Sequence, residues 1–514
     1  MTVRSNTNPY GLGQIKKSFI HFLFGKGVSA LIGVGLLLLT VRALSAESYG
    51  VYVALLAAFE IIQLVSNFGL FTAAYRYVPE LRASNRFTDL RALICWLSVF
   101  RVLTLAIPVA VVALFAQQII VIFKFTVPKE VIFVYGFVVV AEGLSRYIDI
   151  FFDSLLQQKY SQLSLFFRNG LRLLGLLGFI YATNWNVSLE NWLYIELVAS
   201  LVGVMVASVF LWIHIWSLPS DASKGLHKYT YIRRYLTFVG SSYLSQIFGV
   251  VYGPETTKLI LTKVGGAIQV GAFGFAASLS GMLQRYLPVF LLIGLVRPLF
   301  VSVNASENRV MRLNELSNLV LKLNVFVLFP AIAYVLSSGD KLAHLLSGGK
   351  FPDSTSYITV FMLLLVFQTW HAVLGLVILA VEDGMAGLHG TLLGLVGLGV
   401  GLLLLPNFGS MSLCAGLILS ELIWCLYVTY SLANNGIPIK IHWAGIVKIL
   451  AFSVVGFLVV YWMHGIDFIN RYSLVFDAAV ISFIFLCLCY RYKPFSNVER
   501  SIINKILPRP IFVW

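Results

Sequence analysis

The chain alternates long apolar stretches with short polar ones along its whole length. A helix that crosses the hydrocarbon core of a membrane needs about 20 mostly apolar residues. Fourteen stretches approach this length, so we predict an all-α, polytopic membrane protein with 14 transmembrane helices. The predicted spans are 19–41, 51–75, 93–115, 131–152, 165–182, 191–216, 237–261, 270–300, 319–338, 356–381, 390–406, 409–433, 445–465 and 473–490.

The composition supports this interpretation and excludes several classes of protein. Hydrophobic residues make up 59% of the chain and charged residues 11%, against about 25% charged residues in soluble proteins. Such a chain cannot cover its surface with polar groups, so it needs lipid as its solvent. The five cysteines lie in apolar runs without a histidine or further cysteine at ligand spacing, so neither a disulfide framework nor a metal site is expected.

The Lys and Arg residues between the spans predict the orientation. With the N-terminus inside, the inner segments hold 20 of them and the outer loops 7. Because Lys and Arg are enriched on the cytoplasmic side of membrane proteins, we expect both termini in the cytoplasm. The same excess explains most of the net charge of +15, and no nucleic acid is expected as a partner.

An internal repeat divides the predicted helices into two lobes. Arg42 and Lys263 are each followed by a glycine eight positions later and an aromatic residue ten positions later. The interval from Arg42 to Lys263, called the repeat interval below, pairs spans one and two with spans seven and eight. We therefore predict two pseudo-symmetric lobes of six helices, an inter-lobe linker, two further helices and a cytoplasmic basic tail. Their ranges are 1–216 and 237–433 for the lobes, 217–236 for the linker, 434–490 for the helices and 491–514 for the tail.

Several ionisable side chains fall inside the predicted spans. A charged group at mid-span costs at least about 2.5–3.5 kcal/mol on insertion scales, so such groups usually face a polar interior. A cation-lined, water-filled cavity could replace the hydration of a phosphate group, and a buried carboxylate without a partner could load a proton. The cations that we assign to such a cavity are Lys26, Arg101, Arg168, Arg172, Lys258 and Arg285. The carboxylates that we assign to ion or proton coupling are Glu60, Glu196 and Glu255.

Helical spacing limits what some of these residues can do. Glu142 and Arg146 are four positions apart and share a helix face, so we expect an ion pair between them. Arg168 and Arg172 have the same spacing but like charge, which is unfavourable on a bare helix. Either an anion lies between these two arginines, or both reach lipid phosphates at the inner interface.

Glycines recur at every third or fourth position around the eleventh predicted span. They are Gly387, Gly390, Gly394, Gly397 and Gly401. Small residues at this spacing let two membrane helices approach closely. We therefore predict that they form a smooth ridge for helix packing.

Short motifs in both lobes resemble the Wzx-type polysaccharide flippases. The stretch 42–52, with Arg42, Gly50 and Tyr52, resembles the first outer loop of this family, and 67–80, with Arg76 and Pro79, resembles the segment that follows. In the second lobe, 258–261 and 270–276 are also similar to the family. The family belongs to the multidrug/oligosaccharidyl-lipid/polysaccharide (MOP) exporter superfamily.

One position departs from the pattern of this family. Many relatives carry an acidic residue directly before the position of Lys258, where this chain has Thr257, and its nearest acid is Glu255. The ion-coupling site of the family is therefore not reproduced residue for residue.

The resemblance implies a MATE-like pair of lobes and a defined activity. It implies a secondary transporter that flips an undecaprenyl-(pyro)phosphate-linked oligosaccharide from the inner to the outer leaflet by alternating access, for cell-surface polysaccharide synthesis. The location would be the bacterial cytoplasmic (inner) membrane, with lipid-linked oligosaccharide and membrane lipids as partners. A polysaccharide polymerase and export machinery are further candidate partners. Coupling to H⁺ or Na⁺ is left open, and no other cofactor is expected.

Two other functions stay open at the level of sequence. A drug or small-molecule exporter of the same superfamily would favour an acid-dominated cavity, whereas the buried charges of this chain lean basic. A membrane polymerase or ligase acting on lipid-linked sugars would need outer loops that hold substrate. The longest predicted outer loop, 339–355, is short and has no cluster of Arg and His. We therefore expect no enzyme and assign no catalytic residue.

Overall fold

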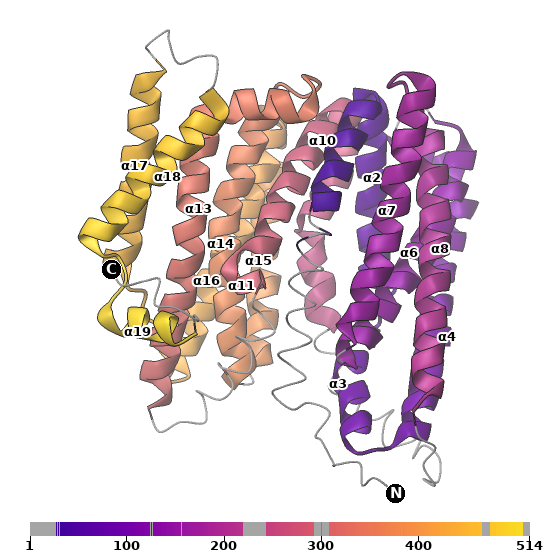
Figure 1. Ribbon diagram of the computed structural model, residues 1–514, viewed down its shortest axis with the longest axis horizontal. Coiled ribbons are helices and arrows are strands. Elements are labelled where there is room, and N and C mark those ends of the chain that lie inside the picture. Colours follow the sequence, from indigo (N-terminus) through magenta and orange to yellow (C-terminus); the bar gives the residue numbers. More distant parts are fainter. Residues whose placement is uncertain are drawn as a thin grey trace, which may run out of the picture. The chain divides into compact units, whose positions relative to one another are not determined.

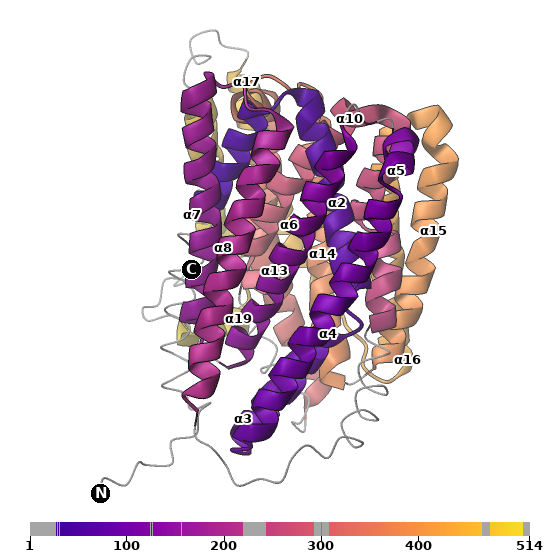
Figure 2. The ribbon, with the colours of Figure 1, turned by 90° about the vertical axis from the view of Figure 1, so that its right-hand side faces the viewer.

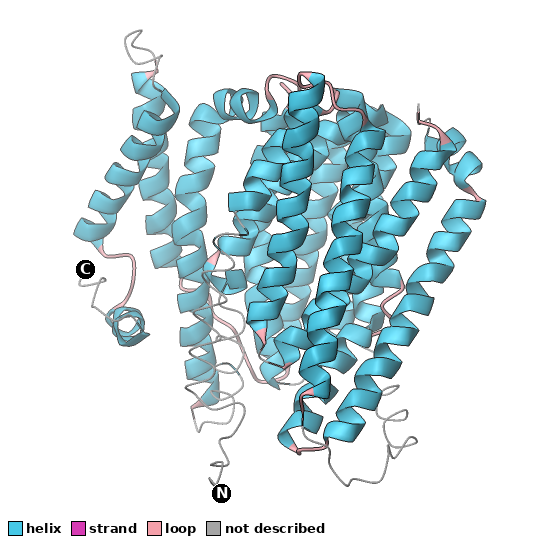
Figure 3. Cartoon of the chain, turned by 45° about the vertical axis from the view of Figure 1, so that its right-hand side comes forward, coloured by secondary structure: helices cyan, strands magenta, loops and turns pink. Residues whose placement is uncertain are grey.

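The computed structural model describes residues 27, 29, 31–123, 125, 127–155, 157–218, 243–291, 300, 308–381, 383–464 and 473–506. In this part of the chain all regular structure is helical, and there is no strand (Figure 3). The chain divides into two compact units. Unit 1 comprises Met1–Val250 and Lys258–Gly271, and unit 2 comprises Val251–Thr257 and Ala272–Trp514.

Unit 1 is built from long helices that pack side by side (Figure 2). A helix over Leu31–Ala43 comes first. It is followed by α2 (Ala46–Val65), α3 (Leu70–Ala83), α4 (Phe87–Leu114), α5 (Ala116–Phe123), α6 (Lys129–Ser154), α7 (Gln158–Thr183) and α8 (Leu189–Trp216). The apolar core between α3, α4, α6 and α8 is centred on aromatic side chains such as Tyr147 and Phe151. The segment 116–130, which we predicted to be an outer loop, contains α5.

Unit 2 contains the C-terminal helices (Figure 1). They are α11 (Pro288–Leu291), α13 (Arg309–Ser347), α14 (Ser354–Val381), α15 (Gly384–Phe408), α16 (Ser410–Asn434), α17 (Trp443–Met463), α18 (Ser473–Tyr492) and α19 (Asn497–Ile506). Helix α13 packs on α14, α17 and α18, and α15 packs on α16. The core of this unit gathers apolar side chains from α13, α14, α16 and α17. The predicted outer loop 339–355 is about half helical, because α13 continues to Ser347.

The second predicted span is broken near its C-terminal end. Helix α2 ends at Val65, and α3 begins at Leu70. Phe68 and Gly69 between them have positive φ angles of 43° and 75°, a backbone region that glycine adopts readily and that other residues rarely visit. The single span 51–75 expected from the apolar pattern is therefore two separate helices.

A second break separates the predicted spans seven and eight. The structure has one helical stretch over Tyr243–Tyr286, 44 residues long, within which α10 runs from Pro254 to Tyr286. At 1.5 Å per residue such a stretch would measure about 66 Å, about twice the thickness of the hydrocarbon core. A turn at Tyr252 and Gly253 interrupts it, and so does Gly266 with φ 76° and ψ 177°. The part after Gly266 is long enough to cross a membrane.

Two pairs of helix boundaries follow the repeat interval. Ser45, which caps the start of α2, and Gly266 are separated by this interval. Val65, which ends α2, and Tyr286, which ends α10, are separated by it too. The pairing of these elements therefore rests on backbone geometry as well as on the matched sequence strings.

Twelve helices of the described residues are long and apolar enough to cross a membrane. The chain is a multi-pass membrane protein. The first half of the first predicted span, 19–41, lies mostly outside the described residues, and the stretch Tyr243–Tyr286 counts once among the twelve. The total of 14 transmembrane helices and the cytoplasmic location of both termini stay predictions. The inter-lobe linker 217–236 also stays a prediction, because it lies mostly outside the described residues.

The glycine ridge is confirmed for four of its five members. A Cβ atom on Gly397 would lie 2.4 Å from the backbone nitrogen of Ser420, and one on Gly401 would lie 3.0 Å from the carbonyl oxygen of Ser412. Gly390 and Gly394 face Trp424 and Tyr252 at 3.1–3.2 Å. Only Gly387 has nothing closer than 3.8 Å.

Candidate functional site

A network of charged side chains, largely buried except for Glu60 and Arg146, lies inside unit 1. It consists of Glu60 from α2, Glu142, Arg146 and Asp149 from α6, Arg168 and Arg172 from α7, and Glu196 from α8. The residues from α6 are spaced by four and three positions, so they share one face of that helix. The arginines of α7 share a face for the same reason.

Glu142 is the centre of this network. Its carboxylate accepts hydrogen bonds from Arg168 at 3.0 Å, from Arg172 at 2.8 Å and from Arg146 at 3.2 Å. The Glu142–Arg146 pair predicted from spacing is therefore confirmed. Glu142 and both α7 arginines are at most 9% exposed. Charge-assisted hydrogen bonds in such a setting are among the stronger polar contacts in proteins.

Three further carboxylates surround this centre. Glu60 accepts from Arg146 at 2.8 Å, and Asp149 accepts from Arg168 at 2.5 Å. The carboxylate of Glu196 lies 3.8 Å from Arg172. Glu60 and Glu196 thus have cationic neighbours, and their assignment to ion or proton coupling stays a prediction.

The network holds one more carboxylate than guanidinium group. Four acids face three arginines, in a chain whose net charge is +15. Within the described residues, Glu196 Oε2 and Asp149 Oδ1 are buried without a hydrogen-bond partner. Because an unpaired negative charge is costly in such surroundings, the arrangement can hold one proton or small cation.

A tyrosine from the family motif reaches this network. The Tyr52 hydroxyl donates a hydrogen bond of 2.7 Å to Glu196, and its ring packs edge-on against Trp192. Ser200 donates to Glu142 at 3.4 Å and accepts from Arg172 at 3.0 Å. Helices α2, α6, α7 and α8 therefore meet at these side chains.

Two glycines make room for polar side chains of unit 1. A Cβ on Gly203 of α8 would lie 2.2 Å from Cγ of Arg168, and one on Gly143 of α6 would lie 1.9 Å from Nε2 of Gln63. Any side chain at these positions would push the neighbouring polar group away. Close approach therefore requires glycine at both positions.

Arg101 forms a second buried site at the break between α2 and α3. Its guanidinium group donates to the side-chain oxygen of Gln63, to the Gln63 carbonyl at 3.3 Å and to Ser66 at 3.1 Å. It also lies over the rings of Phe71 and Tyr147. No carboxylate of the described residues pairs with it. The positive charge instead faces the C-terminal end of α2, where the helix dipole is negative.

The other predicted cavity cations are not brought to this network. Lys26 lies outside the described residues. Lys258 is buried in unit 1, and Arg285 is exposed in unit 2. We expected an anion, either a phosphate group or a lipid headgroup, beside Arg168 and Arg172. Glu142 lies between them instead, so neither is needed to compensate their like charges. Their role in substrate binding stays a prediction.

The remaining motif and coupling residues have distinct positions. Gly50 is buried where a Cβ would lie 1.7 Å from the carbonyl oxygen of Ala267, so α2 and α10 touch there through backbone. Arg42 and Glu255 are half-buried. Pro79 lies inside α3, and the backbone of Arg76 belongs to the same helix.

Sequence reasoning missed a histidine–glutamate pair in unit 2. His371 Nδ1 of α14 lies 2.6 Å from Glu421 Oε2 of α16. The imidazole is stacked on Trp424, with ring centroids 3.5 Å apart. A histidine inside a span is a signal in itself, and it could have been weighed with Glu421. Asp149 was missed because it stands close to the end of its predicted span.

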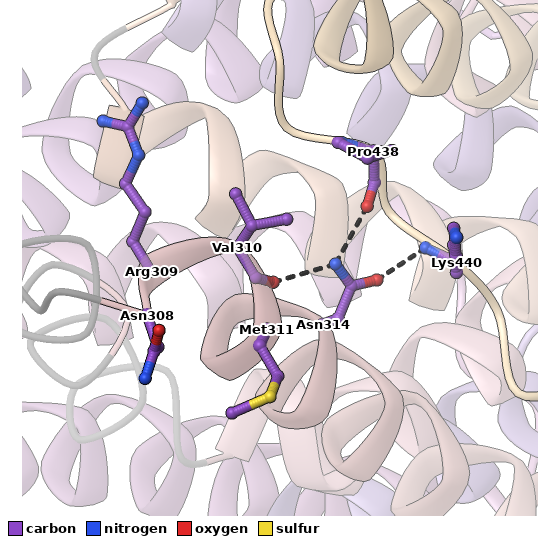
Figure 4. A pocket seen from close by; sticks show the side chains of 7 residues that line it. All are labelled: Asn308, Arg309, Val310, Met311, Asn314, Pro438 and Lys440. Atoms are coloured by element: carbon purple, nitrogen blue, oxygen red, sulfur yellow. Dashed lines mark hydrogen bonds between the residues drawn. The ribbon is translucent and has the colours of Figure 1, made fainter.

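A pocket of about 640 Å³ opens at the start of α13. Asn308, Arg309, Val310, Met311, Asn314, Pro438 and Lys440 line it (Figure 4). The side chain of Asn314 spans it, with hydrogen bonds to the backbone of Pro438 and Lys440. We assign no ligand to this pocket.

Comparison with known proteins identifies the fold. No family model and no curated protein matches the sequence. Among solved structures, the chain is similar to the lipid II flippase MurJ in its inward closed conformation, with a TM-score of 0.64 and 13% identity over 95% of this chain and 100% of that one.

Two transporter structures are also similar. One is the inward-facing conformation of a multidrug resistance MATE family transporter of the MOP superfamily, with TM-score 0.60 and 14% identity over 79% of this chain and 94% of that one. The other is the MATE multidrug transporter DinF-BH, with TM-score 0.59 and 13% identity over 84% of this chain and 97% of that one. The chain is thus a polytopic membrane protein with the MOP fold. More particularly, it shares that fold with a lipid II flippase and with MATE transporters.

Proposed function

We propose that this protein is a secondary transporter that flips an undecaprenyl-(pyro)phosphate-linked oligosaccharide from the inner to the outer leaflet of the bacterial cytoplasmic membrane, for cell-surface polysaccharide synthesis. The fold likeness to a lipid II flippase over 95% of the chain carries this proposal. The motif resemblance to Wzx-type flippases supports the oligosaccharide as cargo. A polymerase and export machinery would then receive the flipped product.

The coverage of the two kinds of neighbour favours a flippase. The MATE structures cover 79% and 84% of this chain, whereas MurJ covers 95%. The missing share is about the size of the segment after α16, which includes α17 to α19 and lies beyond the twelfth predicted span. A flippase fold therefore accounts for more of the chain than an exporter fold does.

We propose separate roles for the buried cations and the buried network. Lys258 and Arg285, which are not part of the network in the described residues, and Lys26, which lies outside them, remain candidates for the phosphate of the substrate. Arg101 is held by Gln63 and Ser66 and would act by fixing the broken second span. The surplus carboxylate of the network, shared by Glu196 and Asp149, would load the coupling H⁺ or Na⁺.

The test is a flipping assay with purified protein in vesicles. A fluorescent undecaprenyl-pyrophosphate disaccharide is added, and the fraction protected from a membrane-impermeant quencher is followed over time. Wild-type protein should move the lipid faster than empty vesicles. Glu196→Gln should slow this movement at least about tenfold and remove its dependence on a proton or sodium gradient, whereas Glu130→Gln, at the exposed start of α6, should behave as wild type. Rates equal to those of empty vesicles would overturn the flippase assignment.

A second candidate is an exporter of small organic cations. The acid surplus of the network in unit 1 favours it, since we expected a basic interior from the sequence. Efflux of a fluorescent organic cation from the same vesicles, without movement of the lipid, would support this alternative. A polymerase or ligase is favoured by no observation among the described residues.

A further inference from the structure

One face of α13 holds the segment between α16 and α17. Asn314 and Asn318 are four positions apart on this face. The Asn314 side chain donates to the Pro438 carbonyl at 2.8 Å and accepts from the Lys440 amide at 2.5 Å (Figure 4). Asn318 donates to the Lys440 carbonyl at 2.8 Å and accepts from the His442 amide at 2.6 Å. The two amides thus bind an extended backbone as a neighbouring strand would.

Lys322 continues the same face one turn further along α13. Its ammonium group lies 2.8 and 2.9 Å from the two carboxylate oxygens of Glu499 on α19, and 2.8 Å from Nδ1 of His442. An ammonium group has three N–H donors and no acceptor. All three donors are therefore used, and Lys322 is fully buried.

Helix α19 is docked at this point by further contacts. Ser496 and Glu499 form a capping box, in which the Ser496 amide donates to Glu499 at 2.7 Å and the Glu499 amide donates to the Ser496 hydroxyl at 3.2 Å. Phe495 is buried against Leu319 of α13. Figures 1 and 3 show α19 lying across the direction of the long helices.

Gly445 at the start of α17 allows this docking. A Cβ there would lie 2.7 Å from Cε of Lys322 and 2.8 Å from the carbonyl oxygen of Pro494. The lysine could move aside, but the Pro494 backbone belongs to the segment that leads into α19. Docking therefore depends on a backbone position without a side chain as well as on charge.

We propose that Lys322, His442 and Glu499 form a latch that releases α19 on acidification. Because the ammonium group can only donate, Nδ1 of His442 must be an acceptor and carry no proton when α19 is docked. Protonation would place a second cation 2.8 Å from Lys322, with one carboxylate to serve both. Acidification therefore favours release of α19.

The latch is separated from the other charged groups around it. Among the charged groups on the packed elements are Glu315 of α13, Lys440 of the segment before α17, Lys448 of α17, Arg491 of α18 and Arg500 of α19. Lys448 donates to the Tyr492 carbonyl, Arg491 lies over the Tyr492 ring, and Arg500 donates to Asn497. In the described part of the chain none of these five side chains bonds to His442. We therefore expect His442 and Glu499 to determine how the docking of α19 depends on pH.

The full-length protein in lipid nanodiscs allows a direct test. Spin labels are placed at Met311→Cys and Val498→Cys, both exposed in unit 2, after the exposed Cys95 and Cys487 are replaced by serine. The distance between the labels is then measured at about pH 8 and about pH 5.5, on either side of the usual histidine range. We expect one narrow distance distribution at the higher pH. At the lower pH a second, longer one should appear, with the undocked-to-docked ratio raised at least about tenfold.

Variants separate a proton switch from mere packing. His442→Gln keeps an acceptor but cannot be protonated, so it should stay docked at both pH values. Glu499→Gln and Gly445→Ala should undock α19 at both, whereas Glu315→Gln, which removes an acid from the same helix outside the latch, should respond as wild type. A wild-type distance that does not change with pH, or a pH response that survives in His442→Gln, would overturn the proposal. The readout is independent of what the protein transports.

Discussion

At the scale of residues, Glu142 is the side chain on which the interior of unit 1 depends most. It accepts from three arginines of two helices, and its carboxylate lies between Arg168 and Arg172, which helical spacing brings to one face of α7. Breaking a buried ion pair by removing one partner is strongly destabilising, since the other charge stays buried. A carboxylate of the chain itself thus compensates the two like charges that stand four positions apart on α7.

Replacing Glu142 by glutamine should therefore destabilise unit 1. We expect a loss of about 3–5 kcal/mol in the free energy of unfolding, seen as a lower melting temperature of the purified protein in detergent. Glu130→Gln removes an acid from the exposed start of the same helix and should leave the melting temperature unchanged. Equal melting temperatures for the two variants would mean that the network contributes nothing to stability.

At the scale of elements, α15 and α16 show how glycine spacing sets a helix distance. They are separate helices joined at Gly409, which has φ 59°, as the two predicted spans 390–406 and 409–433 indicated. Their contact face is a row of small residues, so backbone atoms touch backbone atoms. Such packing relies on dispersion contacts, because lipid tails are as apolar as the helices themselves.

A matched pair of alanine substitutions on α15 tests this contact. Gly397→Ala would place a Cβ 2.4 Å from Ser420 and 2.7 Å from the Gly416 carbonyl, and we expect it to cost about 1–3 kcal/mol by overpacking. Gly399→Ala, two positions further along, meets nothing within 4 Å and should be neutral, or stabilising by up to about 1 kcal/mol. Thermal unfolding in detergent measures both. A Gly397→Ala protein as stable as Gly399→Ala would show that the helices can separate without cost.

The elements also show the limits of sequence reasoning. The pair Glu142–Arg146 and the glycine ridge could be predicted because both are local periodicities of one helix. The contacts of Arg168 with Asp149, and of His371 with Glu421, depend on how two helices are rotated about their axes, which spacing within one helix cannot give. The break between α2 and α3 could have been noticed from the polar residues just after Val65, but the apolar run continued across it.

At the scale of the whole molecule, the repeat organises both units. The repeat interval relates the breaks before α2 and within α10, and it also relates two fully buried cations, Arg101 and Lys322. Arg101 holds the end of a helix in its own unit, whereas Lys322 holds α19. The two buried cations that the repeat interval relates therefore have different roles in the two units.

The orientation in the membrane is the prediction that belongs to this scale. Single cysteines at Ser84 and Asn186, both exposed, are introduced into a background in which Cys95 and Cys487 are serine. If Lys and Arg mark the cytoplasmic side, a membrane-impermeant thiol reagent should label Asn186→Cys in intact cells and Ser84→Cys only after permeabilisation. The reverse pattern would invert the topology and place the predicted inner loops outside.

The pairing of Lys322 with Glu499 has a consequence for the synthesis of the protein. The carboxylate is 177 residues downstream of the lysine, and ribosomes add about 5–20 residues per second. For about 9–35 seconds at that rate, the nascent chain must therefore carry a membrane-embedded lysine whose acid has not yet been made. Maturation of unit 2 is thus delayed until α19 arrives, and a chain cut short before Glu499 would present an unneutralised lysine to the machinery that removes misassembled membrane proteins.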